Sequence, residues 1–149
     1  MKPVKTFPLL LMLGMIVAMV ALDQLFPALR IGPAPHLWLG APPGLAGLAL
    51  LFASAGLFRR RGTTLHPYGE SAVLVQDGLY RYSRNPMYLG MLLVLAGIAA
   101  GLGQLLAALL VPGFVAVVGR QNIRHEERML QEQFGESYRR YCARVRRWL

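Results

Sequence analysis

The chain has 149 residues, of which 55% are hydrophobic and only 15% are charged. This length suits one domain, and the charged share lies well below the roughly 25% of soluble domains. The formal net charge of +9 does not indicate a nucleic-acid partner, because the basic residues flank apolar runs and form no patch interleaved with polar surface. The single cysteine, Cys142, excludes an internal disulfide and a multi-cysteine zinc site.

The first apolar run covers residues 7–25 and approaches the roughly 20 residues that a helix needs to cross the bilayer core. Lys2 and Lys5 before it resemble the start of a signal peptide, but the run is long and is followed by a poor cleavage context. We therefore expect a first membrane helix, with Asp23 near an interface. Residues 26–43 are rich in proline and glycine and predict a loop.

Residues 44–58 predict a second helix, rich in the small residues that let membrane helices approach closely. Residues 62–85 form the longest polar segment, which we expect to fold against the membrane surface. Residues 86–119 contain no charged residue. A single helix of that length would be about 50 Å long, well beyond a core of roughly 30 Å. The segment is also too short for two full spans, so we predict a tight hairpin of two short helices that turns at residues 101–104.

Residues 120–149 are charged and helical in pattern. We expect the second hairpin helix to run on into the aqueous phase and a surface helix to reach the chain end. The predicted fold is an all-α integral membrane protein with four transmembrane helices and a cytoplasmic C-terminal helix. Only Arg30 then falls in the outer loops, so the positive-inside rule places both termini in the cytoplasm. We predict a single domain, with two transmembrane helices in residues 1–58 and the chemical core in residues 59–149.

The two ends of a hairpin lie together, so we expect its polar entrance and exit to form one group. Carboxylates accept hydrogen bonds from an ammonium or from hydroxyls, and arginines hold a carboxylate or phosphate. Pro86 at a helix start leaves free N–H groups suited to an anion. Three structural readings stay open: arginines as membrane anchors, glutamates as a solvated helix face and tyrosines as interfacial residues. The expected group consists of Arg84, Asn85 and Tyr88 at the entrance and Arg124, Glu126 and Glu127 at the exit.

Several strings in the second half of the chain resemble one enzyme family. Residues 84–90 read Arg-Asn-Pro-Met-Tyr-Leu-Gly, residues 74–80 read Leu-Val-Gln-Asp-Gly-Leu-Tyr, and Glu126-Glu127 and residues 145–147 follow in order. Together they resemble the isoprenylcysteine carboxyl methyltransferase family. The related phospholipid N-methyltransferases share the Arg-(His/Asn)-Pro-x-Tyr and Glu-Glu signatures. The resemblance covers residues 59–149.

This resemblance implies S-adenosylmethionine as methyl donor at the cytoplasmic face and a lipophilic acceptor that approaches from the bilayer. Arg124 and Glu127 are the candidates to act on the acceptor. The eukaryotic branch has histidine where Asn85 stands, so a role that needs an imidazole is absent. The position of its acceptor-contacting arginine holds Asn122, with Arg120 and Arg124 on either side. The predicted cofactor contacts are Leu74, Val75, Tyr80, Arg84, Asn85, Pro86, Tyr88 and Glu126.

The acceptor group stays open among a carboxylate, a thiol and an amine. A carboxylate acceptor needs no base. An amine acceptor must first lose a proton, and Glu127 and His125 are the candidate bases. Two other classes also stay open: an NADPH-dependent membrane reductase of the sterol-reductase type, and a non-enzymatic scaffold or transporter subunit. We expect membrane lipids around the chain and no metal, nucleic acid or obligate protein partner.

Overall fold

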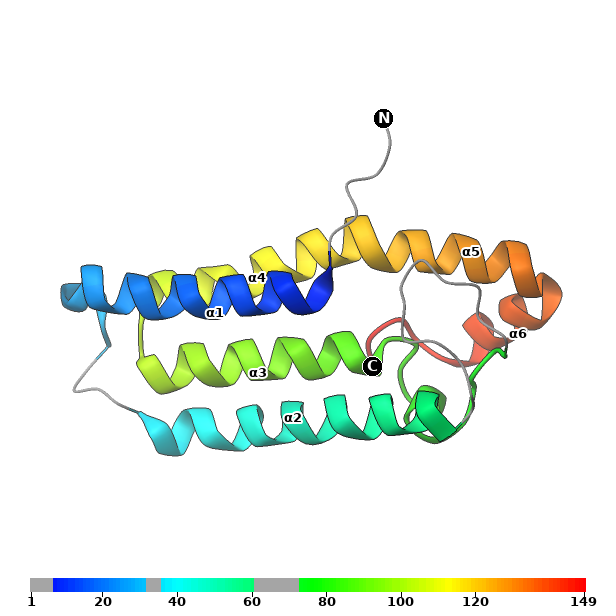
Figure 1. Ribbon diagram of the computed structural model, residues 1–149, viewed down its shortest axis with the longest axis horizontal. Coiled ribbons are helices and arrows are strands. Elements are labelled where there is room, and N and C mark those ends of the chain that lie inside the picture. The colour runs from blue at the N-terminus through cyan, green and yellow to red at the C-terminus, as the bar shows by residue number, and fades with distance from the viewer. Residues whose placement is uncertain (1–6, 32–35, 61–72) are drawn as a thin grey trace.

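The computed structural model describes residues 7–31, 36–60 and 73–149, and over these ranges the chain is helical apart from turns and one isolated bridge. Four helices form a bundle, and the last of them continues beyond it into a fifth helix, next to which a sixth folds back (Figure 1). The first part of the predicted surface segment 62–85, up to residue 72, lies outside the described residues. The elements are α1 (Pro8–Leu25), η1 (Pro27–Leu29), α2 (Leu37–Arg60), η2 (Gly78–Arg81), α3 (Pro86–Leu102), α4 (Leu105–Val118), η3 (Gly119–Ile123), α5 (Arg124–Phe134) and α6 (Glu136–Arg144).

Three stretches of this fold are long and apolar enough to cross a membrane: Pro8–Leu25, Leu37–Leu57 and the continuous helix Leu105–Phe134. The helix α3 is also apolar but has only 17 residues, which corresponds to about 26 Å. The prediction of an all-helical integral membrane protein is thus confirmed. The buried core lies where α1, α3 and α4 meet, and it includes Met19, Leu95 and Phe114.

The start of α2 was predicted wrongly. Residues 26–43 were expected to form a loop, but α2 begins at Leu37 and contains both Pro42 and Pro43. Two prolines remove two main-chain hydrogen bonds from the early part of the helix. Packing of Gly40 outweighs this loss, because a Cβ atom there would lie 2.3 Å from the carbonyl oxygen of Gly97. The first turn of α2 is therefore held against α3 before the prolines occur.

Glycines allow α2 and α3 to pack backbone to backbone along their length. A Cβ atom at Gly97 would lie 2.6 Å from the main-chain nitrogen of Gly44, and one at Gly47 would lie 2.6 Å from the carbonyl oxygen of Gly90. Real Cβ atoms do not approach so closely. Small residues at such a contact are typical of membrane helices, where packing rather than the hydrophobic effect drives association.

The predicted turn between the two hairpin helices is confirmed. Gly103 ends α3 with a left-handed backbone (φ 63°) that glycine adopts without a Cβ penalty. Gln104 then begins α4, accepts a hydrogen bond from the N–H of Leu106 (3.3 Å) and donates from Nε2 to the carbonyl oxygen of Phe26 (2.8 Å). This fixes the turn against the end of α1.

An ion pair closes the same end of the bundle. Asp23, expected near an interface, is 5% exposed. Both of its carboxylate oxygens accept hydrogen bonds from Arg30, at 2.5 Å from Nε and 2.6 Å from Nη2. The buried acidic group thus has a bidentate partner, and the one arginine predicted for the outer loops is occupied in this structural contact.

The C-terminal region differs from the expected helix that reaches the chain end. Gly135 (φ 51°) separates α5 from α6, and α6 stops at Arg144 because Val145 takes an extended conformation. The last residues return to the bundle, so that the chain end lies beside the first turn of α3 (Figure 1). Trp148 packs against the main core there.

Candidate functional site

The entrance to α3 is a turn fixed by its own side chains. Pro86 occupies the first helical position, where its missing N–H costs no hydrogen bond and its fixed φ suits the helix. The hydroxyl of Ser83 accepts a hydrogen bond from the N–H of Asn85 (3.1 Å), and the carbonyl oxygen of Asn85 accepts one from the N–H of Leu89 (3.0 Å). Ser83 and Asn85 are both buried, so this polar turn is built into the bundle end.

Two side-chain contacts join this entrance to the exit of the hairpin. The hydroxyl of Tyr88 donates a hydrogen bond to Oε1 of Glu126, and Nη1 of Arg84 lies 3.2 Å from Oε1 of Glu127. The helix passes through the π-helical turn η3 immediately before these glutamates. Such turns are often found at functional sites. The structure therefore brings together the entrance and exit groups that the hairpin prediction placed side by side.

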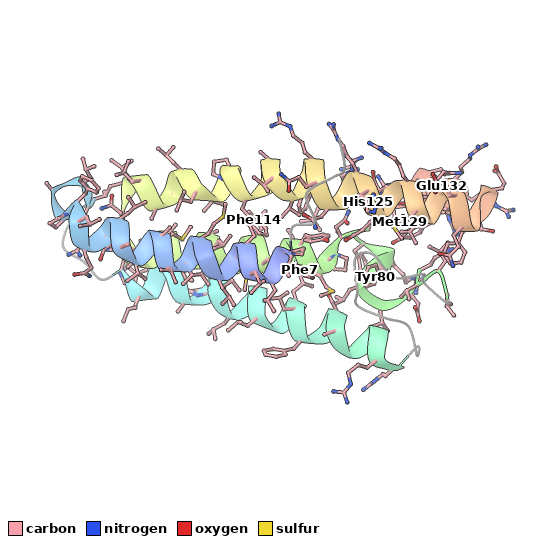
Figure 2. The ribbon with its side chains drawn as sticks, turned by 45° about the horizontal axis from the view of Figure 1, so that its top comes forward. Phe7, Tyr80, Phe114, His125, Met129 and Glu132 are labelled. Atoms are coloured by element: carbon pink, nitrogen blue, oxygen red, sulfur yellow. The ribbon has the colours of Figure 1, made fainter. Side chains whose placement is uncertain are left out.

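A cavity of about 930 Å³ lies against these contacts. Figure 2 shows Phe7, Tyr80 and Met129, which all line it, at the same end of the bundle, whereas Phe114 lies further along α4. Its walls have two distinct parts. The polar part includes Tyr80, Arg84, Asn85, Tyr88, Glu126, Glu127, Tyr138 and Tyr141, and the apolar part includes Phe7, Pro8, Leu9 and Met12 of the α1 end, Leu48, Leu51, Phe52 and Ala55 of α2, and Met87 and Met91 of α3.

The apolar part of the cavity reaches the outer surface of the bundle. Leu9 is 53% exposed and Phe52 is 74% exposed, although both line the cavity. They belong to α1 and α2, which pack on α3. The apolar wall of the cavity therefore includes side chains on the outer surface of both helices.

The two glutamates differ in their electrostatic surroundings. Glu127 receives a bidentate pair from Arg147, at 3.0 Å from Nε and 2.6 Å from Nη2, in addition to Arg84. The hydrogen bonds to Glu127 raise the pKa of Arg147 above the ordinary value of an arginine. Glu126 accepts from Tyr88, and no cationic group of the described residues is within ion-pair distance of it. Glu126 is thus the carboxylate in the polar part with capacity left for a cationic ligand group.

The pair α5 and α6 forms the outer wall of the polar part. Tyr138 and Tyr141 pack with Leu130 and Phe134 in a small second core. The hydroxyl of Tyr141 donates to the carbonyl oxygen of Tyr80 (2.7 Å). Burial raises the pKa of Tyr141 to about 12 and raises the pKa of Tyr80 and Tyr138 as well. The three phenols therefore remain neutral donors and acceptors at physiological pH.

Most of the residues predicted from the sequence lie around this one cavity. Pro86 is buried beneath the turn and does not line it. Arg124 is exposed and also lies outside the lining, so the structure does not bring it to the predicted group. Asn122 is buried and likewise does not line the cavity. Those that line it are Leu74, Val75, Tyr80, Arg84, Asn85, Tyr88, Glu126 and Glu127.

Sequence reasoning missed three parts of the site. The apolar wall from α1 and α2 carries no signal beyond hydrophobicity, and residues 1–58 were expected to supply membrane helices alone. Cys142 accepts a hydrogen bond from Nη1 of Arg84 (2.7 Å), although from the sequence it served only to exclude a disulfide and a multi-cysteine zinc site. Arg147 was noted only as part of a family string. In the described ranges, no cluster of three metal-ligating side chains occurs.

These features define an integral membrane protein with a partly polar, partly apolar cavity at a bundle end. A model of the phospholipid methyltransferase family matches residues 35–137, and the chain belongs to this family. Family membership makes it a membrane methyltransferase.

Two curated relatives match parts of the chain. An uncharacterized protein of Haemophilus influenzae is 46% identical over 63 residues, which cover 42% of this chain and all of that protein. A protein-S-isoprenylcysteine O-methyltransferase of Schizosaccharomyces pombe is 36% identical over 73 residues, which cover 49% of this chain but only 31% of the yeast protein. No solved structure matches the chain at a significant level.

Proposed function

We propose that this protein transfers a methyl group from S-adenosylmethionine to a lipophilic acceptor that enters from the bilayer. The observation that carries the proposal is the single cavity that joins a polar, aromatic part to an apolar part that includes side chains of α1 and α2. A water-soluble donor and a membrane-resident acceptor require these two surroundings next to each other.

The polar part fits the donor in chemistry. The whole cavity of about 930 Å³ is in the range of small-molecule sites. The carboxylate of Glu126 suits an ammonium group, and the hydroxyl of Tyr88 holds that carboxylate in place. The side chains of Leu74, Val75 and Tyr80 offer flat, mostly apolar contact for a purine ring. Asn85 adds an amide oxygen at the entrance to α3.

S-adenosylmethionine supplies a methyl group on a sulfonium. The task that falls to the chain is alignment, because in-line displacement needs the acceptor atom, the methyl carbon and the sulfur nearly collinear. Met87, Met91 and Leu51 belong to the apolar part of the cavity wall and are suited to hold the acceptor end away from water. With a carboxylate or thiolate acceptor, opposite charges cancel in the transition state, which a poorly solvated site favours.

Arg84 and Arg59 are the arginines among the described residues that line the cavity. Arg84 is engaged by Glu127 and Cys142, and Glu127 is held by two arginines. Both of its carboxylate oxygens are already occupied by these guanidinium groups. We therefore assign Glu127 a positioning role and place Arg124, which is exposed, outside the reaction site.

We propose four membrane crossings, in which the short α3 is the third. The arginine-bearing end of α2, the start of α3 and the charged helix α5 all lie at one end of the bundle (Figure 1), and Arg30 at the other end is paired with Asp23. The positive-inside rule then puts the cavity and both chain ends on the cytoplasmic side.

Isothermal titration calorimetry of the purified protein in detergent tests the cofactor. We expect S-adenosylmethionine and its demethylated product to bind, and expect Glu126→Ala to lose this binding while its melting temperature shows a folded protein. NADPH is the comparison ligand. Tighter binding of NADPH than of S-adenosylmethionine would point to a reductase and overturn the proposal.

A further inference from the structure

The last five residues of the chain connect the two hairpin ends beside the polar part of the cavity. After α6 ends, the chain runs back past both hairpin ends, beside the first turn of α3 (Figure 1). Val145 is buried in the small second core, and Trp148 packs on the main core. Residues 145–149, here called the strap, are therefore anchored at both sides of the site.

The main chain of the strap holds the entrance turn. The carbonyl oxygen of Arg146 accepts from the N–H of Arg84 (3.0 Å), and the carbonyl oxygen of Arg147 accepts from Nδ2 of Asn85 (2.9 Å). The hydroxyl of Ser83 also points to the carbonyl oxygen of Arg147 (3.4 Å). The side chain of Asn85 lines the cavity. Because its Nδ2 donates to the strap, its Oδ1 is the atom left to accept a hydrogen bond.

The side chain of Arg147 holds the opposite wall. Its guanidinium forms the two hydrogen bonds to Glu127 given above, at 3.0 and 2.6 Å. Glu127 in turn contacts Arg84 at 3.2 Å. The side chain of Arg147 thus binds α5, and its carbonyl oxygen binds the turn before α3, so this one residue connects the two elements. A bidentate arginine–carboxylate pair fixes orientation as well as distance.

We infer that Arg147 is a positioning residue for the cofactor site, which it acts on through Glu127 and Asn85 without touching the ligand. This inference rests on the proposed function, because it assigns the strap to the same polar cavity. Arg147 does not line that cavity, so its effect is indirect. Loss of its side chain releases Glu127 from this pair and lets α5 move relative to the entrance of α3. The polar groups of the cavity are then no longer pre-organised for the ligand.

The test compares arginine variants of the full chain by calorimetry with S-adenosylhomocysteine and by thermal unfolding. We expect Arg147→Ala to weaken binding on the order of tenfold, as for loss of a charged hydrogen-bonding partner. Arg140 provides the control, because it is exposed on α6 and has no ion pair among the described residues. Its replacement by alanine removes the same charge. We expect Arg140→Ala to change binding by less than about twofold.

Two further variants separate positioning from a general structural role. Arg147→Lys keeps the charge but not the bidentate geometry, so its affinity should lie between those of the unaltered protein and Arg147→Ala. In a Glu127→Gln background, Arg147→Ala should cause a smaller loss than it does alone, because the two residues act through one contact.

The outcomes distinguish this inference from the proposed function. If the unaltered protein does not bind S-adenosylhomocysteine, the proposed function and the role of the strap both fail. If the unaltered protein binds and Arg147→Ala binds equally well, the strap inference alone is overturned. It is also overturned if Arg147→Ala and Arg147→Lys weaken binding only in proportion to a lowered melting temperature.

Discussion

Removal of the phenolic hydroxyl of Tyr88 tests the contact that closes the hairpin. Tyr88→Phe keeps the ring in the 7% exposed position that it occupies and deletes the hydrogen bond to Glu126. A hydrogen bond to a charged group contributes about 1.5–3 kcal/mol. Glu126 lines the cavity, so the lower half of this range applies, about 1.5–2 kcal/mol. This corresponds to a loss of roughly tenfold to thirtyfold in cofactor affinity.

Tyr82→Phe is the matched control for this prediction. Tyr82 lies near the same entrance but is 74% exposed and does not line the cavity. Calorimetric titration of S-adenosylhomocysteine into both variants gives the comparison. Equal affinity of Tyr88→Phe and Tyr82→Phe would refute the argument that Tyr88 presents Glu126 to the ligand.

Two further predictions concern the stability of the fold. Gly97→Ala should lower the free energy of unfolding by about 1–3 kcal/mol through overpacking. Gly14→Ala is the control, because a Cβ atom there meets nothing within 4 Å, and it should be neutral or stabilising by up to about 1 kcal/mol. Thermal unfolding in detergent measures both, and equal effects would contradict the backbone contact of α2 with α3. Burial raises the pKa of Tyr141 to about 12 from 10.0, so the folded state keeps the phenol proton longer than the unfolded state. This contribution to stability is fully present below pH 10 and is lost as pH rises through about 12. The melting temperature of Tyr141→Phe should fall less over this range than that of the unaltered protein, and parallel curves would show that Tyr141 is not involved.

The sequence was sufficient to predict the helical hairpin. The uncharged run 86–119 is too long for one span and too short for two, and Gly103 supplies the left-handed turn. From this topology followed the approach of the entrance group to the exit group, because charge and helix length fix where such a hairpin must begin and end. Which side chains pair, Tyr88 with Glu126 and Arg84 with Glu127, did not follow from it.

Features that depend on distant packing could not be predicted in this way. The prolines of α2 indicated a loop, and only the contact of Gly40 with α3 explains why a helix forms there. The strap around Arg147 is a non-repetitive segment with no periodic signal, held by main-chain carbonyl groups that every residue possesses. The apolar wall from α1 and α2 consists of residues that any membrane helix would carry. Its role depends on α1 and α2 both packing on α3, which no local pattern encodes.

Methyl transfer itself is the most direct test of the central claim. Purified protein in lipid vesicles is incubated with S-adenosylmethionine that carries an isotopically labelled methyl group, and the lipid extract is analysed by mass spectrometry. We predict a mass shift of one labelled methyl group in a lipid-soluble acceptor, present with the unaltered protein and lost in Glu126→Ala. A label that stays in the aqueous fraction, or that reaches lipid equally with Glu126→Ala, would contradict a cofactor site open to the bilayer.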